Sequence, residues 1–361
     1  MNKTTTSPVS VALVAALGSL LLLSLAVIAA IPAGSGVQIY YEDWVDRDRS
    51  RTVPVKIYIP AEVSAPLPVI LFSHGLGGSR EAASYLCEHW ADHQYICIAM
   101  QHPGSDESFW KPKAAQNPGI TRAELLDEFR QTVADPRHAL NRVNDVHFVL
   151  NELERRNKAP GVLQGKLDLN AIAIAGHSYG AWTALAASGQ RAGRFAALQS
   201  GDPRIKAAVY LSPPAARFGD PKLIYGSIAI PGFHFTGTRD DSPIGDTKAG
   251  DRRMAYDNIS GSDQYLVILK GADHMVFNGR PRAIESPLDA KQHKLTQVAT
   301  TRFFDAYLKH DEKSLSWLTG SGAQKLFAGE GTFESKHPAS ASDLFFRSNF
   351  TKTSGRAAGW R

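Results

Sequence analysis

The chain has 361 residues, and 43% of them are hydrophobic, which is enough apolar material for one large folded core. Its formal net charge is only +5 and no stretch is dense in lysine or arginine, so the composition argues against nucleic acid as a partner. No linker rich in glycine, serine or proline divides the middle of the sequence, which therefore predicts one principal domain.

An apolar segment stands at the N-terminus. It runs from Val9 to Ile31, follows the basic residue Lys3 and is interrupted only by small residues. Small residues up to Ala33 are typical of a signal-peptidase site, whereas the length of the segment approaches the ~20 residues that span a bilayer. We therefore expect residues 1–33 to be a signal peptide or an N-terminal membrane anchor. The protein is then exported, periplasmic or extracellular, or associated with the membrane through this segment.

The next elements in the chain predict an α/β fold. Residues 37–44 and 53–59 predict an antiparallel strand pair, after which apolar strands alternate with helices. The expected strands are 67–73, 95–100, 171–175, 205–211, 232–236 and 265–269, and the expected helices are 79–92, 135–157, 181–187 and 288–308. Such alternation predicts a doubly wound, mostly parallel sheet over one domain, residues 37–333. Residues 101–134 and a basic tail, 334–361, are expected to be irregular.

A G-x-S-x-G motif, Gly176-His177-Ser178-Tyr179-Gly180, lies between a predicted strand and a predicted helix. The glycines allow a turn so tight that a Cβ at either position would collide with the neighbouring strand or helix. The turn holds the serine hydroxyl clear of the sheet, at the positive end of the helix. This context is that of a nucleophile elbow, so Ser178 is the predicted nucleophile.

A base for Ser178 is predicted from chain order. Ligands of such sheets bind beyond the carboxyl ends of the strands, and the acid and the histidine follow the serine in that order. His274 lies in a short glycine-containing loop after the strand 265–269. His293 and His310 fall in or next to a helical region and His337 in the tail, so His274 is the predicted base.

The acid is expected in the loop after the strand 232–236, which contains Asp240 and Asp241. In hydrolases of this type the acid commonly stands three residues after the glycine that closes the strand, and Gly237 makes that residue Asp240. Asp241 begins an Asp-Ser-Pro turn and is the alternative; Asp220 is a more distant one.

An oxyanion hole requires two backbone N–H groups directed at the developing alkoxide. The elbow itself supplies the N–H of Tyr179. The second donor is expected in the loop HGLGG (74–78) after the strand 67–73, where the glycines let the backbone approach a substrate closely. Leu76 is the candidate in that loop.

Four stretches resemble one branch of the α/β-hydrolase superfamily, which holds the plasma-type platelet-activating-factor acetylhydrolases and predicted dienelactone hydrolases. These stretches are FSHGLGGSR, YICIAMQHPGSD, DVHFVLNELERRN and LDLNAIAIAGHSYGAWTALAA. The resemblance covers roughly residues 37–308. It implies a serine esterase with an α/β-hydrolase fold that needs neither a metal nor an organic cofactor, and it implies that Leu76 and Tyr179 form the oxyanion hole.

Two features depart from these relatives. Platelet-activating-factor acetylhydrolases carry the acid directly after the strand that follows the elbow helix, but here that strand ends in YLSPP (210–214), without a carboxylate. The departure favours an acid after the next strand, as in most other α/β hydrolases. Dienelactone hydrolases proper use a cysteine nucleophile, and Ser178 stands in its place.

The leading hypothesis is hydrolysis of a small-molecule or lipid carboxylic ester through an acyl-enzyme on Ser178. The alternatives are a peptidase or an acyltransferase on the same triad, or a non-catalytic, membrane-tethered binding protein. No HExxH or cysteine-pair spacing points to a metal. Cys87 and Cys97 are expected either to form a disulfide or to be small buried side chains, one on a helix and one on the next strand.

Overall fold

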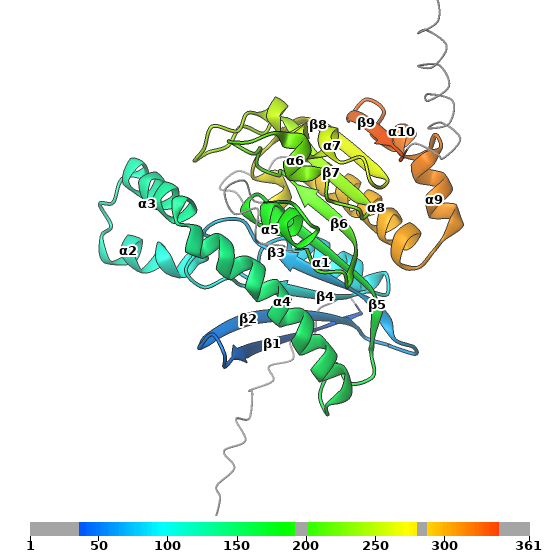
Figure 1. The fold of residues 1–361 in the computed structure, drawn as a ribbon, viewed down its shortest axis with the longest axis horizontal. Coiled ribbons are helices and arrows are strands. Elements are labelled where there is room, and N and C mark those ends of the chain that lie inside the picture. The colour runs from blue at the N-terminus through cyan, green and yellow to red at the C-terminus, as the bar shows by residue number, and fades with distance from the viewer. Residues whose placement is uncertain (1–35, 192–200, 280–286, 339–361) are drawn as a thin grey trace, which may run out of the picture.

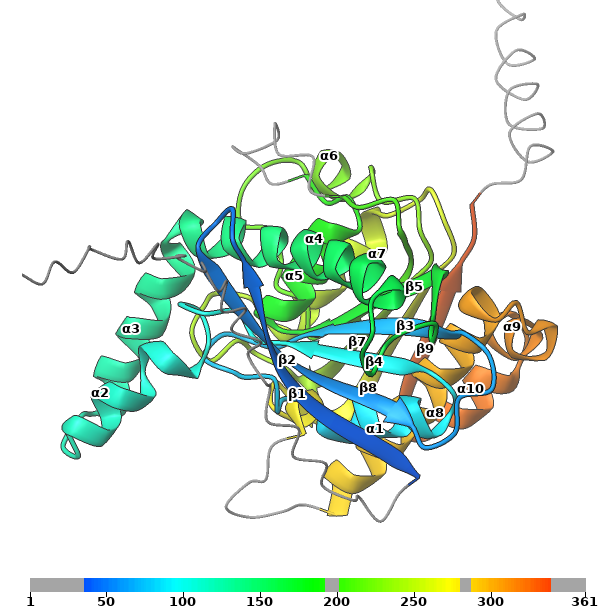
Figure 2. The same ribbon diagram turned by 90° about the horizontal axis from the view of Figure 1, so that it is seen from below.

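The computed structural model describes residues 36–191, 201–279 and 287–338, so the predicted signal or anchor segment lies outside the described residues. These residues form a nine-stranded sheet with helices on both faces (Figures 1 and 2). None of the described helices is long and apolar enough to cross a bilayer. The strands are β1 (Val37–Asp46), β2 (Arg51–Pro60), β3 (Leu67–Ser73), β4 (Ile96–Met100), β5 (Leu167–His177), β6 (Ile205–Leu211), β7 (Gly232–Arg239), β8 (Gln264–Asp273) and β9 (Gly331–Lys336).

The sheet is parallel in its centre and antiparallel at its edges. The strand order is β1-β2-β4-β3-β5-β6-β7-β8-β9; β3 to β8 pair in parallel, whereas β1–β2, β2–β4 and β8–β9 pair antiparallel. This confirms the predicted α/β fold with its N-terminal antiparallel pair. The chain runs from β3 to β4 on one side and then to β5 on the other, so the order reverses between β3 and β5. A ligand site is expected beyond the carboxyl ends of strands at such a point.

Two apolar layers hold the helices to the sheet. Ile70 and Phe72 of β3 join one layer with α1 (Ser84–Asp92) and α8 (Pro287–Leu308), and the alternate residues Val69 and Leu71 join the other. That second layer contains α4 (Pro136–Lys158) and α5 (Tyr179–Ala187). The predicted start of α4 is confirmed, because Asp135 caps the helix by accepting the N–H of Arg137 and Pro136 occupies the first turn.

The segment 101–134, expected to be irregular, contains the short 3-10 helix η1 (Glu107–Phe109) and two helices, α2 (Lys111–Gln116) and α3 (Arg122–Ala134). The expectation was wrong because α3 has no fully buried residue and therefore lacks a broad apolar stripe. Its start is nevertheless encoded locally, by a capping box between Thr121 and Glu124. Figure 1 shows α2 and α3 projecting from one side of the sheet.

The sheet extends beyond the predicted domain boundary at 333. Strand β9 ends at Lys336, and Phe333 packs against the aromatic ring of Tyr265 on β8, with the ring centroids 6.0 Å apart. The short elements that the sequence did not predict are α6 (Pro221–Tyr225), η3 (Ala249–Arg253), α7 (Met254–Asn258), η4 (Val276–Asn278), α9 (Glu312–Thr319) and α10 (Gly322–Phe327). The tail beyond residue 338 lies outside the described residues.

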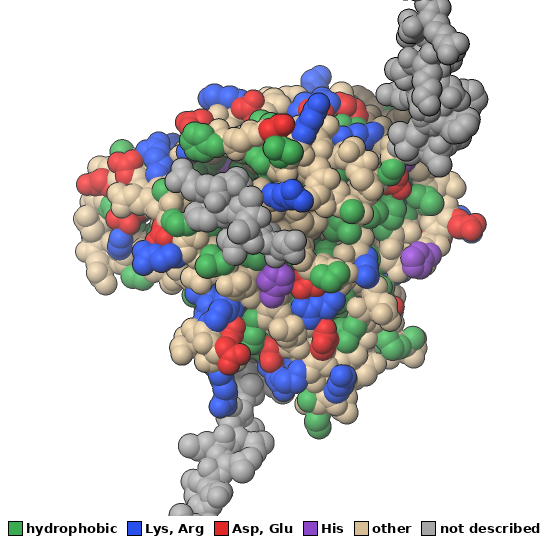
Figure 3. Space-filling view, in the orientation of Figure 1, with side chains coloured by type: hydrophobic (Ala, Val, Ile, Leu, Met, Phe, Trp, Pro, Cys, Tyr) green, Lys and Arg blue, Asp and Glu red, His purple; other side chains and the backbone are tan. Residues whose placement is uncertain are grey.

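Cys87 of α1 and Cys97 of β4 are both free and buried. Of the two expectations for this pair, the structure has the small buried side chains on a helix and on the next strand. Burial raises the pKa of the Cys97 thiol. On the molecular face seen in Figure 3, acidic and basic side chains are interspersed over the surface.

Candidate active site

Ser178 stands between β5 and α5 in a sharp turn. Its backbone has φ 55° and ψ −117°, in the positive-φ region that non-glycine residues rarely adopt. A Cβ on Gly176 would lie 2.2 Å from the carbonyl oxygen of Gly180, and a Cβ on Gly180 would lie 1.9 Å from that of Ser73. The predicted collisions at both glycines are therefore confirmed, and the strained turn places the serine hydroxyl at the start of α5.

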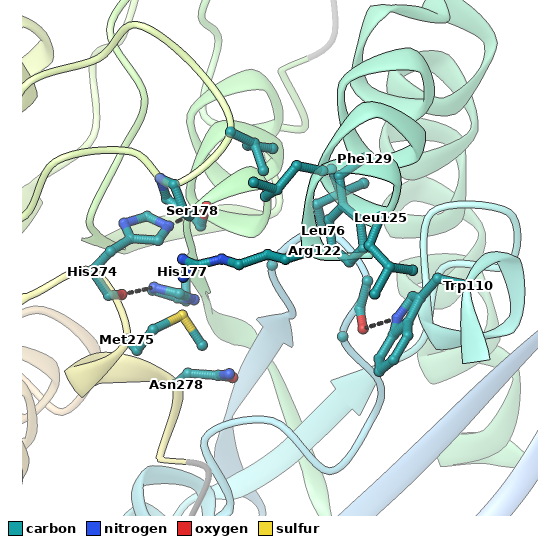
Figure 4. A pocket seen from close by; sticks show the side chains of 16 residues that line it. Leu76, Trp110, Arg122, Leu125, Phe129, His177, Ser178, His274, Met275 and Asn278 are labelled. Atoms are coloured by element: carbon teal, nitrogen blue, oxygen red, sulfur yellow. Dashed lines mark hydrogen bonds between the residues drawn. The ribbon is translucent and has the colours of Figure 1, made fainter. Parts of the chain in front are cut away.

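The structure brings the three predicted triad residues together at the carboxyl ends of β5, β7 and β8. The Nε2 atom of His274 lies 2.9 Å from Ser178 Oγ, and its Nδ1 atom lies 2.7 Å from Asp240 Oδ1. Asp240 is fully buried and His274 nearly so. Figure 4 shows His274 directed at Ser178. Both hydrogen bonds lie within the range that proton transfer requires.

The two alternative acids have other roles in the described structure. Asp241 is exposed; one of its carboxylate oxygens accepts the N–H of Ala249 at 3.0 Å and the other lies 3.3 Å from Lys248 Nζ. Asp220 caps α6 by accepting the N–H of Lys222 at 2.9 Å. Asp240 is thus the candidate acid that contacts His274.

The carboxylate of Asp240 is held by hydroxyl groups on its far side. Its Oδ2 atom accepts hydrogen bonds from Ser212 Oγ at 2.6 Å and from Thr236 Oγ1 at 2.9 Å. Ser212 follows β6 directly and has φ 52°. It belongs to the YLSPP stretch, in which the sequence lacks the carboxylate of the resembling family. A hydroxyl there binds the carboxylate supplied by the next strand.

Arg252 is a second link between Asp240 and His274. Its buried side chain places Nε 2.8 Å from Asp240 Oδ1 and Nη2 2.9 Å from His274 Nδ1. Burial lowers the pKa of Arg252, and the negative charge of Asp240 opposes that shift. Arginine can only donate, so a hydrogen bond from Nη2 requires an unprotonated Nδ1, whereas the hydrogen bond from Nδ1 to Asp240 requires a protonated one.

Only a protonated Nδ1 prepares His274 to act as a base. Nε2 then carries a lone pair directed at Ser178 Oγ. The guanidinium of Arg252 also donates to the carbonyl oxygens of Asp240 at 2.6 Å and of Ser212 at 2.7 Å. Because Arg252 has these other acceptors, it does not need Nδ1 as one, and Nδ1 can carry the proton that it donates to Asp240. We infer that Arg252 positions the carboxylate rather than the imidazole.

Replacing Arg252 with glutamine should reduce both stability and turnover. Removing one partner of a buried ion pair leaves Asp240 as an unpaired buried charge, which costs about 3–5 kcal/mol of unfolding free energy. We expect kcat to fall by about 10- to 100-fold, because Asp240 loses the donor that fixes its orientation. Urea unfolding and ester kinetics on the same samples measure the two effects.

The neighbouring residue provides the matched control. Arg253 has a half-exposed side chain and pairs with Asp257 and Glu334 at 2.9 Å each. Its replacement with glutamine removes the same charge but should cost no more than about 1 kcal/mol and leave kcat near the unmodified value. Equal effects of the two substitutions would contradict the role assigned to Arg252.

The two candidate oxyanion donors lie on either side of Ser178. The N–H of Tyr179 is in the first turn of α5, where no intrahelical acceptor exists. The N–H of Leu76 has no hydrogen-bond acceptor among the described residues. A Cβ on Gly75 would lie 3.4 Å from Ser178 Cβ, so the loop that carries Leu76 packs directly against the elbow.

Arg142 of α4 ties these two donors together. Its guanidinium is buried, donates to the carbonyl oxygen of His74 at 2.8 Å and stacks on the ring of Tyr179, 4.4 Å from the ring centroid. Burial lowers the pKa of Arg142 to about 10, so it remains a cation at neutral pH. The loop before Leu76 and the side chain of Tyr179 are thus held by one residue.

A second Ser-His-Asp chain lies beneath this loop. Ser73 Oγ is 2.9 Å from His102 Nε2, and His102 Nδ1 is 3.0 Å from Asp145 Oδ2. All three residues are fully buried, so no substrate reaches them. Burial lowers the pKa of His102 to about 4, and the neutral ring supports the end of β3.

Two cavities meet at Ser178. The smaller, of about 320 Å³, is lined by His274 and by apolar side chains that include Trp110 and Phe129. The larger, of about 710 Å³, is lined by Tyr179, Trp182 and residues of the loop after β6. Leu76, Ser178 and Ile244 line both. An ester bond at Ser178 can therefore extend one of its two parts into each cavity.

Ser212, Arg142 and Arg252 are the supporting residues that sequence reasoning missed. Ser212 had a signal, since it follows a strand that points at the site. Arg142 and Arg252 had none, because each lies on a helix where an arginine is typical of a solvated surface. Within the described residues, no cluster of three histidine, cysteine or acidic side chains is arranged to hold a metal.

Comparison with known proteins finds a family match in the region of the nucleophile. The model of the family described as platelet-activating factor acetylhydrolase, isoform II, matches residues 49–198. The platelet-activating factor acetylhydrolase of Cavia porcellus is 30% identical over 152 residues, which cover 37% of this chain and 34% of the relative. That of Canis lupus familiaris is 27% identical over 158 residues, which cover 38% and 35%.

The chain thus matches about a third of the length of these curated relatives. The family match contains Leu76 and Ser178, whereas Asp240 and His274 lie beyond it. The parallel sheet, the elbow and the position of the match agree with one another. The chain has an α/β fold consistent with that of the α/β hydrolases, and over residues 49–198 it resembles the platelet-activating-factor acetylhydrolase branch of that superfamily.

Proposed function

We propose that the protein is a serine esterase that hydrolyses carboxylic esters with Ser178, His274 and Asp240 as its catalytic triad. The observation that carries this proposal is the hydrogen-bonded chain from Ser178 Oγ through His274 to Asp240, at 2.9 and 2.7 Å. The serine of this chain faces both cavities, so it is accessible to a substrate.

The reaction follows from this geometry. His274 Nε2 takes the proton of Ser178 as the hydroxyl attacks the ester carbonyl, and Asp240 stabilises the imidazolium that forms. The N–H groups of Leu76 and Tyr179 bind the negative oxygen of the tetrahedral intermediate. His274 then protonates the departing alcohol, and a water molecule activated by the same histidine hydrolyses the acyl-enzyme.

The substrate is expected to be a small-molecule or lipid ester. The relatives are named for acetyl hydrolysis of platelet-activating factor, which supports a lipid ester here as well. The apolar walls of both cavities support the same class. We also expect the N-terminal segment 1–33 to direct export, either as a cleaved signal peptide or as a retained membrane anchor.

Purified full-length protein should hydrolyse p-nitrophenyl esters and react with a fluorophosphonate probe. A panel of increasing acyl length measures which acyl groups the site accepts, and mass spectrometry locates the adduct. We expect one probe per chain, on Ser178. An adduct on another serine, or turnover of peptide amides at rates that exceed those of esters, would contradict the proposal.

A further inference from the structure

Arg122 is the one arginine or lysine among the described residues that line the smaller cavity. It begins α3 and lines the smaller cavity together with Leu125 and Phe129 of the same helix. Figure 4 shows its side chain extended across the cavity toward the side on which Ser178 and His274 stand. The side chain is exposed, so a ligand in the cavity can reach it.

Arg122 has no counter-ion in the part of the chain that the structure describes. The acidic residues of α3 are engaged elsewhere: Glu124 accepts from Thr121, Asp127 pairs with Arg130 at 2.6 Å and Glu128 pairs with Lys113 at 2.6 Å. No carboxylate is among the described residues that line the smaller cavity. The positive charge is therefore available to a ligand.

The smaller cavity is the place for the alcohol part of the ester. The alcohol oxygen must receive a proton from His274, which requires it to lie about 3 Å from Nε2. His274 lines the smaller cavity, whereas Tyr179 and Trp182 line the larger one. A substrate placed in this way has its acyl group in the larger cavity and its alcohol part in the smaller cavity, next to Arg122.

We propose that Arg122 selects esters whose alcohol part carries an anionic group, a carboxylate or a phosphate. Arginine binds both groups through paired N–H donors, and apolar surroundings strengthen such a contact. Leu125, Phe129 and Trp110 enclose the carbon skeleton, while the anion meets the guanidinium, which extends toward the side of Ser178 and His274. This inference rests on the proposed esterase function and adds the substrate class to it.

The test compares two acetate esters that differ at one carboxyl group, which is free in 5-acetoxy-2-nitrobenzoate and methylated in its neutral methyl ester. Wild-type protein should show a higher kcat/KM for the anionic ester. In Arg122→Gln the ratio of the two kcat/KM values should fall by about 10- to 100-fold, and in Arg122→Glu the preference should reverse. Arg155→Gln is the control, because Arg155 is an exposed residue of α4 paired with Glu152 and lines neither cavity.

Two further measurements separate the outcomes. Competition by phenyl phosphate and by benzoate identifies which anion the site prefers. Calorimetric titration with the product 5-hydroxy-2-nitrobenzoate tests Arg122 without turnover, and its affinity should fall in Arg122→Gln. An anion preference that is absent from the wild type or unchanged in Arg122→Gln overturns the inference. Hydrolysis of the neutral ester with labelling at Ser178 would leave the esterase function standing in that case.

Discussion

Replacing Ser178 with alanine should lower esterase activity by a factor on the order of 10⁴–10⁶. The nucleophile is then absent, and the oxyanion donors and the cavities alone give only a small residual rate. The fold should persist, because the side chain is partly exposed and its hydroxyl is hydrogen-bonded to His274 and not to the sheet or the helix that flank it. Ester kinetics, fluorophosphonate labelling and thermal unfolding on one preparation separate loss of chemistry from loss of structure.

Ser188 offers a matched control on the same helix. It stands at the other end of α5, where its hydroxyl donates to the carbonyl oxygen of Ala184 and accepts from Tyr210. Ser188→Ala should cost about 1 kcal/mol of stability and leave labelling at Ser178 intact. If Ser178→Ala retained wild-type activity, or Ser188→Ala lost the label, the nucleophile would lie elsewhere.

The site residues that could be predicted from the sequence are those that directly follow particular strands. An elbow needs glycines for steric reasons, and an acid and a histidine must follow particular strands, so Ser178, Asp240 and His274 were nameable from spacing and order. The structure places His274 within hydrogen-bonding distance of both Ser178 and Asp240. The same logic identified the loop of Leu76, which packs against the elbow.

The residues that support the triad lack such a signal. Arg252 belongs to the 3-10 helix η3 and Arg142 to the long helix α4, and their burial depends on contacts with segments far away in the chain. Helix α3, which carries Arg122, has no fully buried residue and was therefore hidden from a search for apolar periodicity. Tertiary contacts determine where these residues lie, and such contacts leave no pattern in the local sequence.

Replacing Asp240 with asparagine should reduce kcat by at least about 10²- to 10⁴-fold. An amide group that faces Nδ1 with its NH₂ donates to the imidazole, which moves the ring proton to Nε2 and removes the base. The hydroxyl groups of Ser212 and Thr236 both donate to Oδ2 and favour this wrong orientation, whereas Arg252, which contacts Oδ1, opposes it. A loss in kcat with little change in KM is the expected signature.

The adjacent residue makes the experiment decisive, because Asp241→Asn changes the same group one position along the chain. The N–H of Ala249 holds the pKa of Asp241 below its usual value, and the exposed carboxylate contacts Lys248 rather than His274. Asparagine keeps an acceptor for the Ala249 N–H, so kcat should fall by less than about tenfold. A larger loss at Asp241 would mean that the catalytic loop is shifted by one residue from the arrangement described. If neither substitution mattered, the acid would have to come from another loop, and Asp220, which caps α6, would be the next residue to replace.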